Sequence, residues 1–426
     1  MFKTLKNAFG LPDLRKKIFY TLFILLIFRI GSQIYVPYVS SGVDEAIRTY
    51  AQGSIFEYLN LLSGSAFSQA TLFALSVSPY ITASIVIQLL TIAIPALEKL
   101  SKQGPEGQKK ITQITRGVTA ILALVTAFGY YIMLKSQDML INDGVFAAIV
   151  IIACYSAGAA LIMWLAEKIN ENGIGNGISL ILLINILSSG PSIVTAMINA
   201  FKNGPVKAII AVVALIIGIG MIMFIVFMTN SERKIPIQYA KRVVGRKMYG
   251  GQNSNLPIKL NMTGVMPIIF AQSIVSLPAT IGMFVNAKEG TFWHGFFNFF
   301  SPTNWFYSVI YLILIVAFAY FYIAISFNPV EVANNLQSNG GVVPGIRQGR
   351  PTAEYITKIL NRITFIGALF LGVIAVLPLI ASMIDPSLSA LAFGGSSIII
   401  VVGVILETVR EIEAQTTMRH YKGFLE

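Results

Sequence analysis

The chain has 426 residues, of which 55% are hydrophobic and only 12% are charged, and its formal net charge is +12. Soluble domains carry about 25% charged residues, so this composition excludes an ordinary soluble fold and indicates a membrane protein. A single cysteine excludes a disulfide within the chain, and two distant histidines exclude a zinc or iron centre built from Cys and His. No P-loop, G-x-S-x-G or H-E-x-x-H pattern occurs. We therefore expect no enzymatic activity, no cofactor and no metal.

Ten long apolar runs, taken in chain order, predict ten transmembrane helices. About 20 apolar residues cross the roughly 30 Å of hydrocarbon, and only closed backbone hydrogen bonding is tolerated there. The runs are Ile18–Val36, Leu72–Leu97, Val118–Leu134, Val145–Ala166, Ile178–Met197, Ala208–Met228, Val265–Val285, Trp305–Phe327, Ile363–Ile384 and Leu391–Leu406. The predicted fold class is therefore an all-α membrane protein.

The basic residues between these runs alternate along the chain. Of the 31 lysines and arginines, 25 lie in the N-terminus and in every second segment after it, 5 lie in the intervening segments, and Arg29 lies inside the first run. Basic residues concentrate on the cytoplasmic side of a membrane, so both termini are predicted to be cytoplasmic. The alternation also supports the number ten, because one missed helix would disrupt it.

Ten spans with both termini on one side permit two halves of five helices. An odd number of helices per half places the halves in opposite orientations, as in the inverted repeats of membrane conduits. We predict a boundary near Asn203, which gives an N-terminal half of residues 1–203 and a C-terminal half of residues 204–426. This prediction rests on parity alone.

Three connections are longer than a tight turn requires. Residues 38–71 lie outside, and their end, about residues 54–70, is apolar but too short to span, which predicts a re-entrant, interfacial or buried segment. Residues 229–264 and 328–362 form two basic loops on the cytoplasmic side. Long loops are more often functional than idle, so both are candidate contact surfaces.

The second run is polar for a membrane helix. Its residues Ser84, Gln88 and Thr91 share one face, because they are spaced four and then three residues apart. Such a face either forms hydrogen bonds within a static bundle or meets a polar path, and the residues leave both interpretations open.

The cores of the runs contain no aspartate or glutamate. A secondary transporter of a small solute shares the inverted-repeat architecture but is expected to bury an ionisable residue near mid-membrane, and it stays the alternative function. An intramembrane enzyme requires a nucleophile with a base, and no run contains a histidine. A conduit without covalent chemistry fits the residues best.

Several short motifs follow one another along the whole chain. They are Ser78–Leu90, Gly104–Gly107, Asn172–Ser179, Tyr239–Arg242, Leu256–Asn261, Val343–Arg347 and Glu411–Gln415. Each motif is weak alone, but in this order on ten helices they resemble the SecY family of protein translocase channels. The resemblance implies a central pore through which unfolded polypeptides cross the bacterial cytoplasmic membrane, and from which membrane segments leave sideways into lipid.

The resemblance also implies roles for individual residues. The plug that closes the channel corresponds to Asn60, Leu61, Leu62, Ser63, Gly64, Ser65, Ala66 and Phe67. The lateral gate includes Thr82, Gln88 and Gln272, and the pore ring is Ile81, Ile85, Leu182, Ile269 and Ile400. A ring of bulky apolar side chains can dewet and so block ions. Because Ile81 and Ile85 are one helical turn apart, they face the same way.

The same resemblance implies the partners. The sequence has no nucleotide site, so an external motor is needed, and the family implies the SecA motor or the ribosome. Arg242, Arg246 and Arg347 in the two basic loops match the family's contact positions. The family further implies the small membrane subunits SecE and SecG, signal sequences as ligands, and membrane lipid as surroundings.

Overall fold

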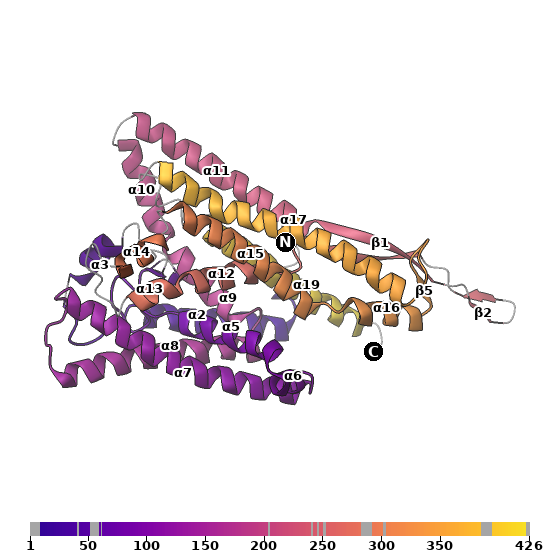
Figure 1. Cartoon of the computed structure of the whole chain (residues 1–426), viewed down its shortest axis with the longest axis horizontal. Coiled ribbons are helices and arrows are strands. Elements are labelled where there is room, and N and C mark those ends of the chain that lie inside the picture. The colour runs from indigo at the N-terminus through magenta and orange to yellow at the C-terminus, as the bar shows by residue number, and fades with distance from the viewer. Residues whose placement is uncertain are drawn as a thin grey trace.

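The structure is a computed structural model, and it is mostly helical (Figure 1). It describes residues 9–40, 42–51, 59–60, 62–202, 205–239, 242–244, 247–249, 253–282, 292–300, 304–384 and 394–422. The predicted boundary between two halves falls at residues 203 and 204, which lie outside the described residues. The division into halves therefore stays a prediction.

The first part of the chain consists of helices. They are α2 (Pro12–Gly31), α3 (Val43–Ala51), α5 (Ser78–Ala93), α6 (Pro95–Ser101), α7 (Pro105–Ser136), α8 (Val145–Asn172), α9 (Gly177–Ser188) and α10 (Gly190–Lys202). In the second part, the described residues form further helices and five strands. The helices are α11 (Pro205–Asn230), α12 (Met266–Val275), α13 (Leu277–Gly282), α14 (Phe292–Phe299), α15 (Trp305–Ser326), α16 (Pro329–Ser338), α17 (Arg350–Ile384) and α19 (Gly394–Lys422).

Membrane-length helices are confirmed, but the number ten is not. Among the described residues, five helical stretches are long and apolar enough to span, and a sixth is obtained if the bent pair α5 and α6 counts as one span. The other predicted runs correspond to helices that are short, interrupted or rich in charge at one end. Ten spans therefore stay a prediction, although several membrane-length helices are established.

Three predicted runs are not continuous helices. The run Leu72–Leu97 begins its helix only at Ser78, and α5 and α6 meet at a bend of 105°. Proline at position 95 explains the bend, because proline starts a helix readily but cannot continue one. The fifth run divides into α9 and α10, and the seventh divides into α12 and α13.

Local sequence explains why the fifth helix starts where it does. The Asn176 side chain accepts hydrogen bonds from the backbone N–H groups of Ile178 and Ser179, at 3.1 and 3.3 Å, which caps α9. Gly175 before it has φ +82°, and a Cβ on Gly177 would lie 2.1 Å from the carbonyl oxygen of Ala166. The predicted glycine-rich turn therefore exists, and it allows α9 to approach α8 closely.

The helices form two groups that meet along two seams (Figure 1). In the first group α8 contacts α2, α7 and α9, and α5 contacts α7. In the second group α15 lies between α12 and α17, while α19 contacts α11 and α17. The groups meet where α9 contacts α19 and where α5 contacts α12.

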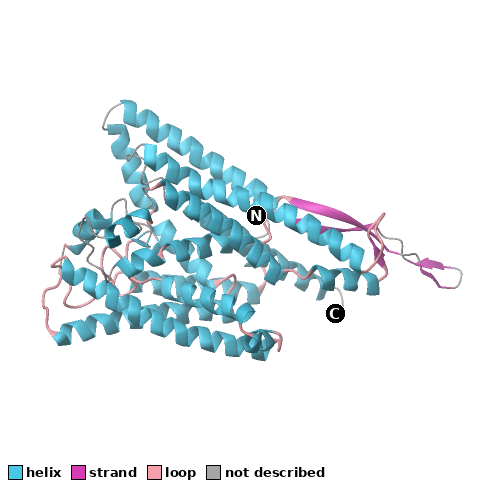
Figure 2. Cartoon of the chain, in the orientation of Figure 1, coloured by secondary structure: helices cyan, strands magenta, loops and turns pink. Residues whose placement is uncertain are grey.

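The two predicted cytoplasmic loops are not separate loops, because they form one sheet. Strand β1 (Glu232–Tyr239) pairs antiparallel with β4 (Asn253–Lys259) and with β5 (Gly341–Val342), in the order β4-β1-β5. Strands β2 (Arg242–Val244) and β3 (Lys247–Tyr249) form a second, two-stranded sheet. Figure 2 shows the strands gathered at one end of the molecule.

This end has a hydrophobic core of its own. Ile235 from β1, Ile258 from β4 and Ile356 from α17 are buried in one cluster with Val343. Helix α17 begins at Arg350, so the last part of the predicted loop 328–362 is helical and extends the helix toward the sheet. The fold is therefore mostly helical, and the prediction of an all-α protein is wrong for this end.

Candidate functional site

The five residues of the predicted ring come from four helices and are all buried. Ile81 and Ile85 lie in α5, Leu182 in α9, Ile269 in α12 and Ile400 in α19, and none is more than 6% exposed. All five belong to one hydrophobic cluster that crosses both seams between the helix groups. The cluster extends well beyond them, so burial alone does not assign a ring.

The predicted plug is a compact turn segment just before α5. Leu62, Ser63, Ala66 and Phe67 are buried, while Leu61 lies outside the described residues. The segment is stabilised by bonds to its own side chains. The N–H of Phe67 donates to the Ser63 hydroxyl at 2.9 Å, and the N–H of Ser68 donates to the side-chain oxygen of Asn60 at 2.9 Å.

Side chains from the surrounding helices donate to the backbone of this segment and of the turn after it. The Tyr130 hydroxyl in α7 donates to the carbonyl of Phe67 at 2.6 Å, and the Tyr155 hydroxyl in α8 donates to the carbonyl of Ala70 at 3.2 Å. From α9, the Asn185 amide donates to the carbonyl of Leu62 at 2.7 Å. The structure thus holds the segment inside the bundle, where bare carbonyl groups would be costly.

Sequence reasoning missed these donors. Tyr130, Tyr155 and Asn185 were predicted only as parts of apolar runs, although each carries a polar group into a predicted membrane helix. A buried tyrosine hydroxyl or asparagine amide usually finds a partner, which is the signal that was available.

The predicted gate residues lie on helices that contact each other, but they are not bonded to one another. The Thr82 hydroxyl donates to the carbonyl of Ser78 in its own helix at 3.1 Å. The Gln272 amide donates to the Tyr307 hydroxyl at 2.9 Å, which joins α12 to α15. The side-chain oxygen of Gln88 is buried and has no hydrogen-bond partner within the described part of the chain.

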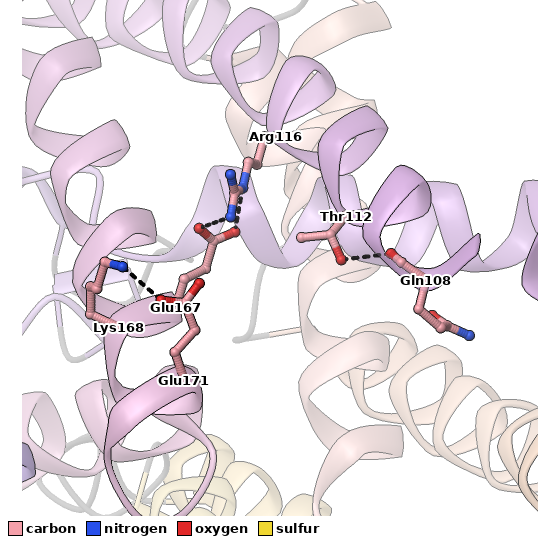
Figure 3. A network of polar contacts seen from close by, with 6 residues as sticks. All are labelled: Gln108, Thr112, Arg116, Glu167, Lys168 and Glu171. Carbon is pink, nitrogen blue, oxygen red and sulfur yellow. Dashed lines mark hydrogen bonds and ion pairs between the residues drawn. The ribbon is translucent and has the colours of Figure 1, made fainter. Parts of the chain in front are cut away.

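A forked ion pair joins α7 to α8. Arg116 meets Glu167 through two contacts, Nη2 to Oε2 at 2.6 Å and Nε to Oε1 at 2.8 Å (Figure 3). The Glu167 side chain is 12% exposed, so the carboxylate is largely shielded and this geometry is the strong form of an arginine pair. Lys168, the residue after Glu167, pairs with Glu171 one turn further along α8 at 2.6 Å. The pair of Arg116 and Glu167 holds α7 against α8. Because α7 also packs against α5, the pair stabilises the arrangement of the first helix group.

The predicted contact arginines lie at the end that carries the strands. Arg347 is exposed in a turn between Gly345 and Gly349, whose φ angles are +82° and +84°. Arg242 begins β2, and Arg246 lies outside the described residues. At the opposite end of β1 from β5, desolvation and then the positive charge of Arg410 lower the pKa of the Lys259 ammonium below its ordinary value. The structure therefore places Arg347 on an accessible surface, and it does not identify a partner.

Comparison with known proteins decides the family. The sequence profile of the SecY family matches residues 71–409. The protein translocase subunit SecY of Streptomyces galbus is 42% identical over 442 residues, which cover 100% of both chains. The chain belongs to the SecY family. This confirms the predictions of a polypeptide channel and of a protein that is not an enzyme, while nothing in the similarities supports a secondary transporter.

Solved structures of SecY-type channels share the fold. One, described as showing that the plug domain of the SecY protein stabilises the closed state and maintains a membrane seal, has a TM-score of 0.65 at 17% identity and covers 94% of this chain and 92% of its own. Another, Sec61 in the canine ribosome-channel complex, has a TM-score of 0.61 at 16% identity with the same coverage.

Proposed function

We propose that this SecY-family chain conducts unfolded polypeptides across a bacterial cytoplasmic membrane, with residues 60–67 as its plug. The observation that carries the proposal is the segment's position. It is too short to span, yet side chains of α7 and α9 bind its backbone within the helix bundle, and a side chain of α8 binds the carbonyl of Ala70 just after it. The related SecY channel is described as sealed by its plug domain, and the same role fits this segment.

The ring and the gate follow from the same architecture. The buried side chains Ile81, Ile85, Leu182, Ile269 and Ile400 form the apolar constriction of a pore between residues 1–203 and 204–426, the two inverted halves of five spans each. The seam between α5 and α12 carries Thr82, Gln88 and Gln272 and opens sideways to release membrane segments and signal sequences into lipid.

The strand-bearing end meets the partners. With both termini cytoplasmic, the three-stranded sheet, the turn of Arg347 and Arg242 of β2 project into the cytoplasm. Arg246, from the same basic loop, is assigned to the same contact surface. Arginine forks suit acidic protein surfaces and RNA phosphate, so this end docks the SecA motor and the ribosome. Ribosome-bound Sec61 has the same fold, which supports the second partner. SecE and SecG complete the complex within the membrane.

Deletion of Asn60–Phe67 tests the plug. Purified channel is reconstituted into planar bilayers, and ion conductance is measured without substrate. We expect the deletion to raise the conductance, because the apolar ring alone then separates the two aqueous sides. Intact channel carrying Thr119→Val is the control, since Thr119 is buried and its hydroxyl donates only to Thr115 of its own helix. A deleted channel that stays as tight as the control contradicts the assignment of the plug.

A further inference from the structure

Asn185 joins three separated parts of the chain. It lies in α9 and is fully buried. Its amide nitrogen donates to the carbonyl of Leu62 at 2.7 Å and to the hydroxyl of Ser76 at 3.2 Å, and the Ser76 hydroxyl donates to the same Leu62 carbonyl at 3.1 Å. One amide therefore holds the start of the plug and the turn that leads into α5.

The backbone next to these three hydrogen-bonded groups allows the plug to lie close to α9. A Cβ on Gly64 would lie 2.5 Å from the Ser188 hydroxyl and 3.0 Å from the carbonyl oxygen of Asn185, so only glycine lets the plug lie this close to α9. The Ser188 hydroxyl, one turn after Asn185, donates to the carbonyl of Asn185 at 2.7 Å and also lies 3.3 Å from the carbonyl of Gly64. Leu182 of the proposed ring lies one turn before Asn185 and is also buried, so the polar contact borders the constriction.

Only one of the two polar atoms of the Asn185 side chain, the amide nitrogen, forms hydrogen bonds in the described part of the chain. Its side-chain oxygen is buried and has no hydrogen-bond partner within the described residues. Exchanging the oxygen and nitrogen would place two acceptors, the amide oxygen and the Leu62 carbonyl, against each other, so the amide orientation is fixed by its neighbours. An unpaired buried acceptor is unfavourable, so it offsets part of the stabilisation that the two donated bonds provide. The closed state is thus held by two donated bonds and weakened by one unpaired oxygen.

We propose that Asn185, together with Ser76, is a latch that holds the plug in the closed channel and sets how readily the channel opens. The inference rests on the proposed role of residues 60–67 as the plug. Asn185 is a positioning residue, because it acts through the plug.

The first test compares open probability in planar bilayers. Asn185→Leu keeps the branching and the number of side-chain heavy atoms, and it removes the donor together with the unpaired oxygen. We expect an increase of about tenfold, which corresponds to about 1.4 kcal/mol and matches the loss of buried hydrogen bonds. Ser76→Ala keeps the bond from Asn185 to Leu62 and should give a smaller increase. Thr119→Val, a buried polar-to-apolar change away from the plug, should leave open probability unchanged.

The second test separates the latch from a purely structural role of Asn185. In the channel that lacks Asn60–Phe67, Asn185→Leu should change open probability no further, because its partner is gone. If Asn185→Leu raises open probability equally with and without the plug, Asn185 shapes the pore wall and the latch is wrong. If the deletion opens the channel but Asn185→Leu and Ser76→Ala do not, the plug stands and the latch is wrong. If the deletion itself changes nothing, the plug assignment fails first.

Discussion

The helix bundle and the strand-bearing end stabilise non-helical chain in different ways. At the strand-bearing end, β1 satisfies its backbone by pairing with β4 from Glu232 to Gln238 and with β5 at its far end. In the bundle, the carbonyl groups of Leu62, Phe67 and Ala70 accept hydrogen bonds from side chains of three helices.

Solvent explains the difference. Strands can pair at an end that reaches water, since water satisfies whatever the ladder leaves open. Irregular backbone at membrane depth is tolerated only where protein covers it, so helices must supply the donors from their side chains. Polar side chains inside apolar runs therefore indicate where non-helical chain docks, whereas strand pairing carries no such local signal.

Reversing the charge of Arg347 should give the largest loss of translocation. This change tests the role of the strand-bearing end alone. The exposed side chain of Arg347 follows β5, and Glu in its place would repel the acidic surface of the proposed motor. We expect Arg347→Glu to abolish motor-driven translocation in proteoliposomes while conductance without substrate stays unchanged. Arg347→Lys should retain only part of the translocation activity, because lysine keeps the positive charge but cannot form the two parallel hydrogen bonds of a guanidinium.

The neighbouring Arg350 provides the matched control. Its side chain is 90% exposed and pairs with Glu354 in the first turn of α17. Arg350→Glu should translocate nearly normally if Arg347 makes the specific contact. Equal losses in both variants indicate that net charge at this end matters and the position does not.

A polar side chain in the ring should give the next largest effect, and one confined to the bundle. Ile400 is fully buried, and Ile400→Asn places an amide among apolar side chains, at a cost to the dry closed state of about 1–3 kcal/mol. We expect higher single-channel conductance and better export of a protein with a defective signal sequence. Ile400→Val removes one methylene, costs about 1 kcal/mol and should be mild. Wild-type values for Ile400→Asn in both assays place the constriction elsewhere.

Sequence alone predicts what depends on composition and short spacing. Hydropathy places α7, α8, α11 and α15, and the glycine-rich turn with Asn176 places the start of α9. The ring residues come from four predicted runs and do lie in one cluster. These features are local, or follow from burying every apolar face in one core.

What sequence could not supply are pairings between distant segments. The β1–β5 pair joins Gln238 to Val342, and neither segment carries a period that names its partner. The bend at Ile94, by contrast, could have been predicted from the sequence. Pro95 follows Ile94, and proline interrupts a helix even within a continuous apolar run. The donors to the proposed plug and the turn after it could be suspected as polar groups in apolar runs. Which carbonyl each donor meets depends on the packed structure.

The two tyrosines that bind the plug region give the smallest and sharpest comparison. Tyr130→Phe and Tyr155→Phe each remove one hydroxyl and keep the ring, and the two rings pack edge to face at 4.9 Å. Bond length alone favours Tyr130, whose bond to Phe67 is 2.6 Å against 3.2 Å for Tyr155 to Ala70. The carbonyl of Phe67, however, also accepts from the N–H of Ala70 at 3.2 Å, so it keeps a partner when Tyr130 is changed.

We therefore expect Tyr155→Phe, which removes the longer of the two bonds, to destabilise the channel more than Tyr130→Phe. The carbonyl of Ala70 has no second hydrogen bond among the described residues, so Tyr155→Phe leaves it buried and unpaired, at about 1–3 kcal/mol, against about 0.5–1.5 kcal/mol for Tyr130→Phe. Thermal unfolding of the purified complex and substrate-free conductance measure both effects, since a loosened plug region melts earlier and leaks more. The opposite order, in which the Tyr130→Phe channel melts earlier and leaks more than the Tyr155→Phe channel, would contradict this expectation. It would show that the length of the lost bond decides the effect, and that leaving a carbonyl without a partner does not.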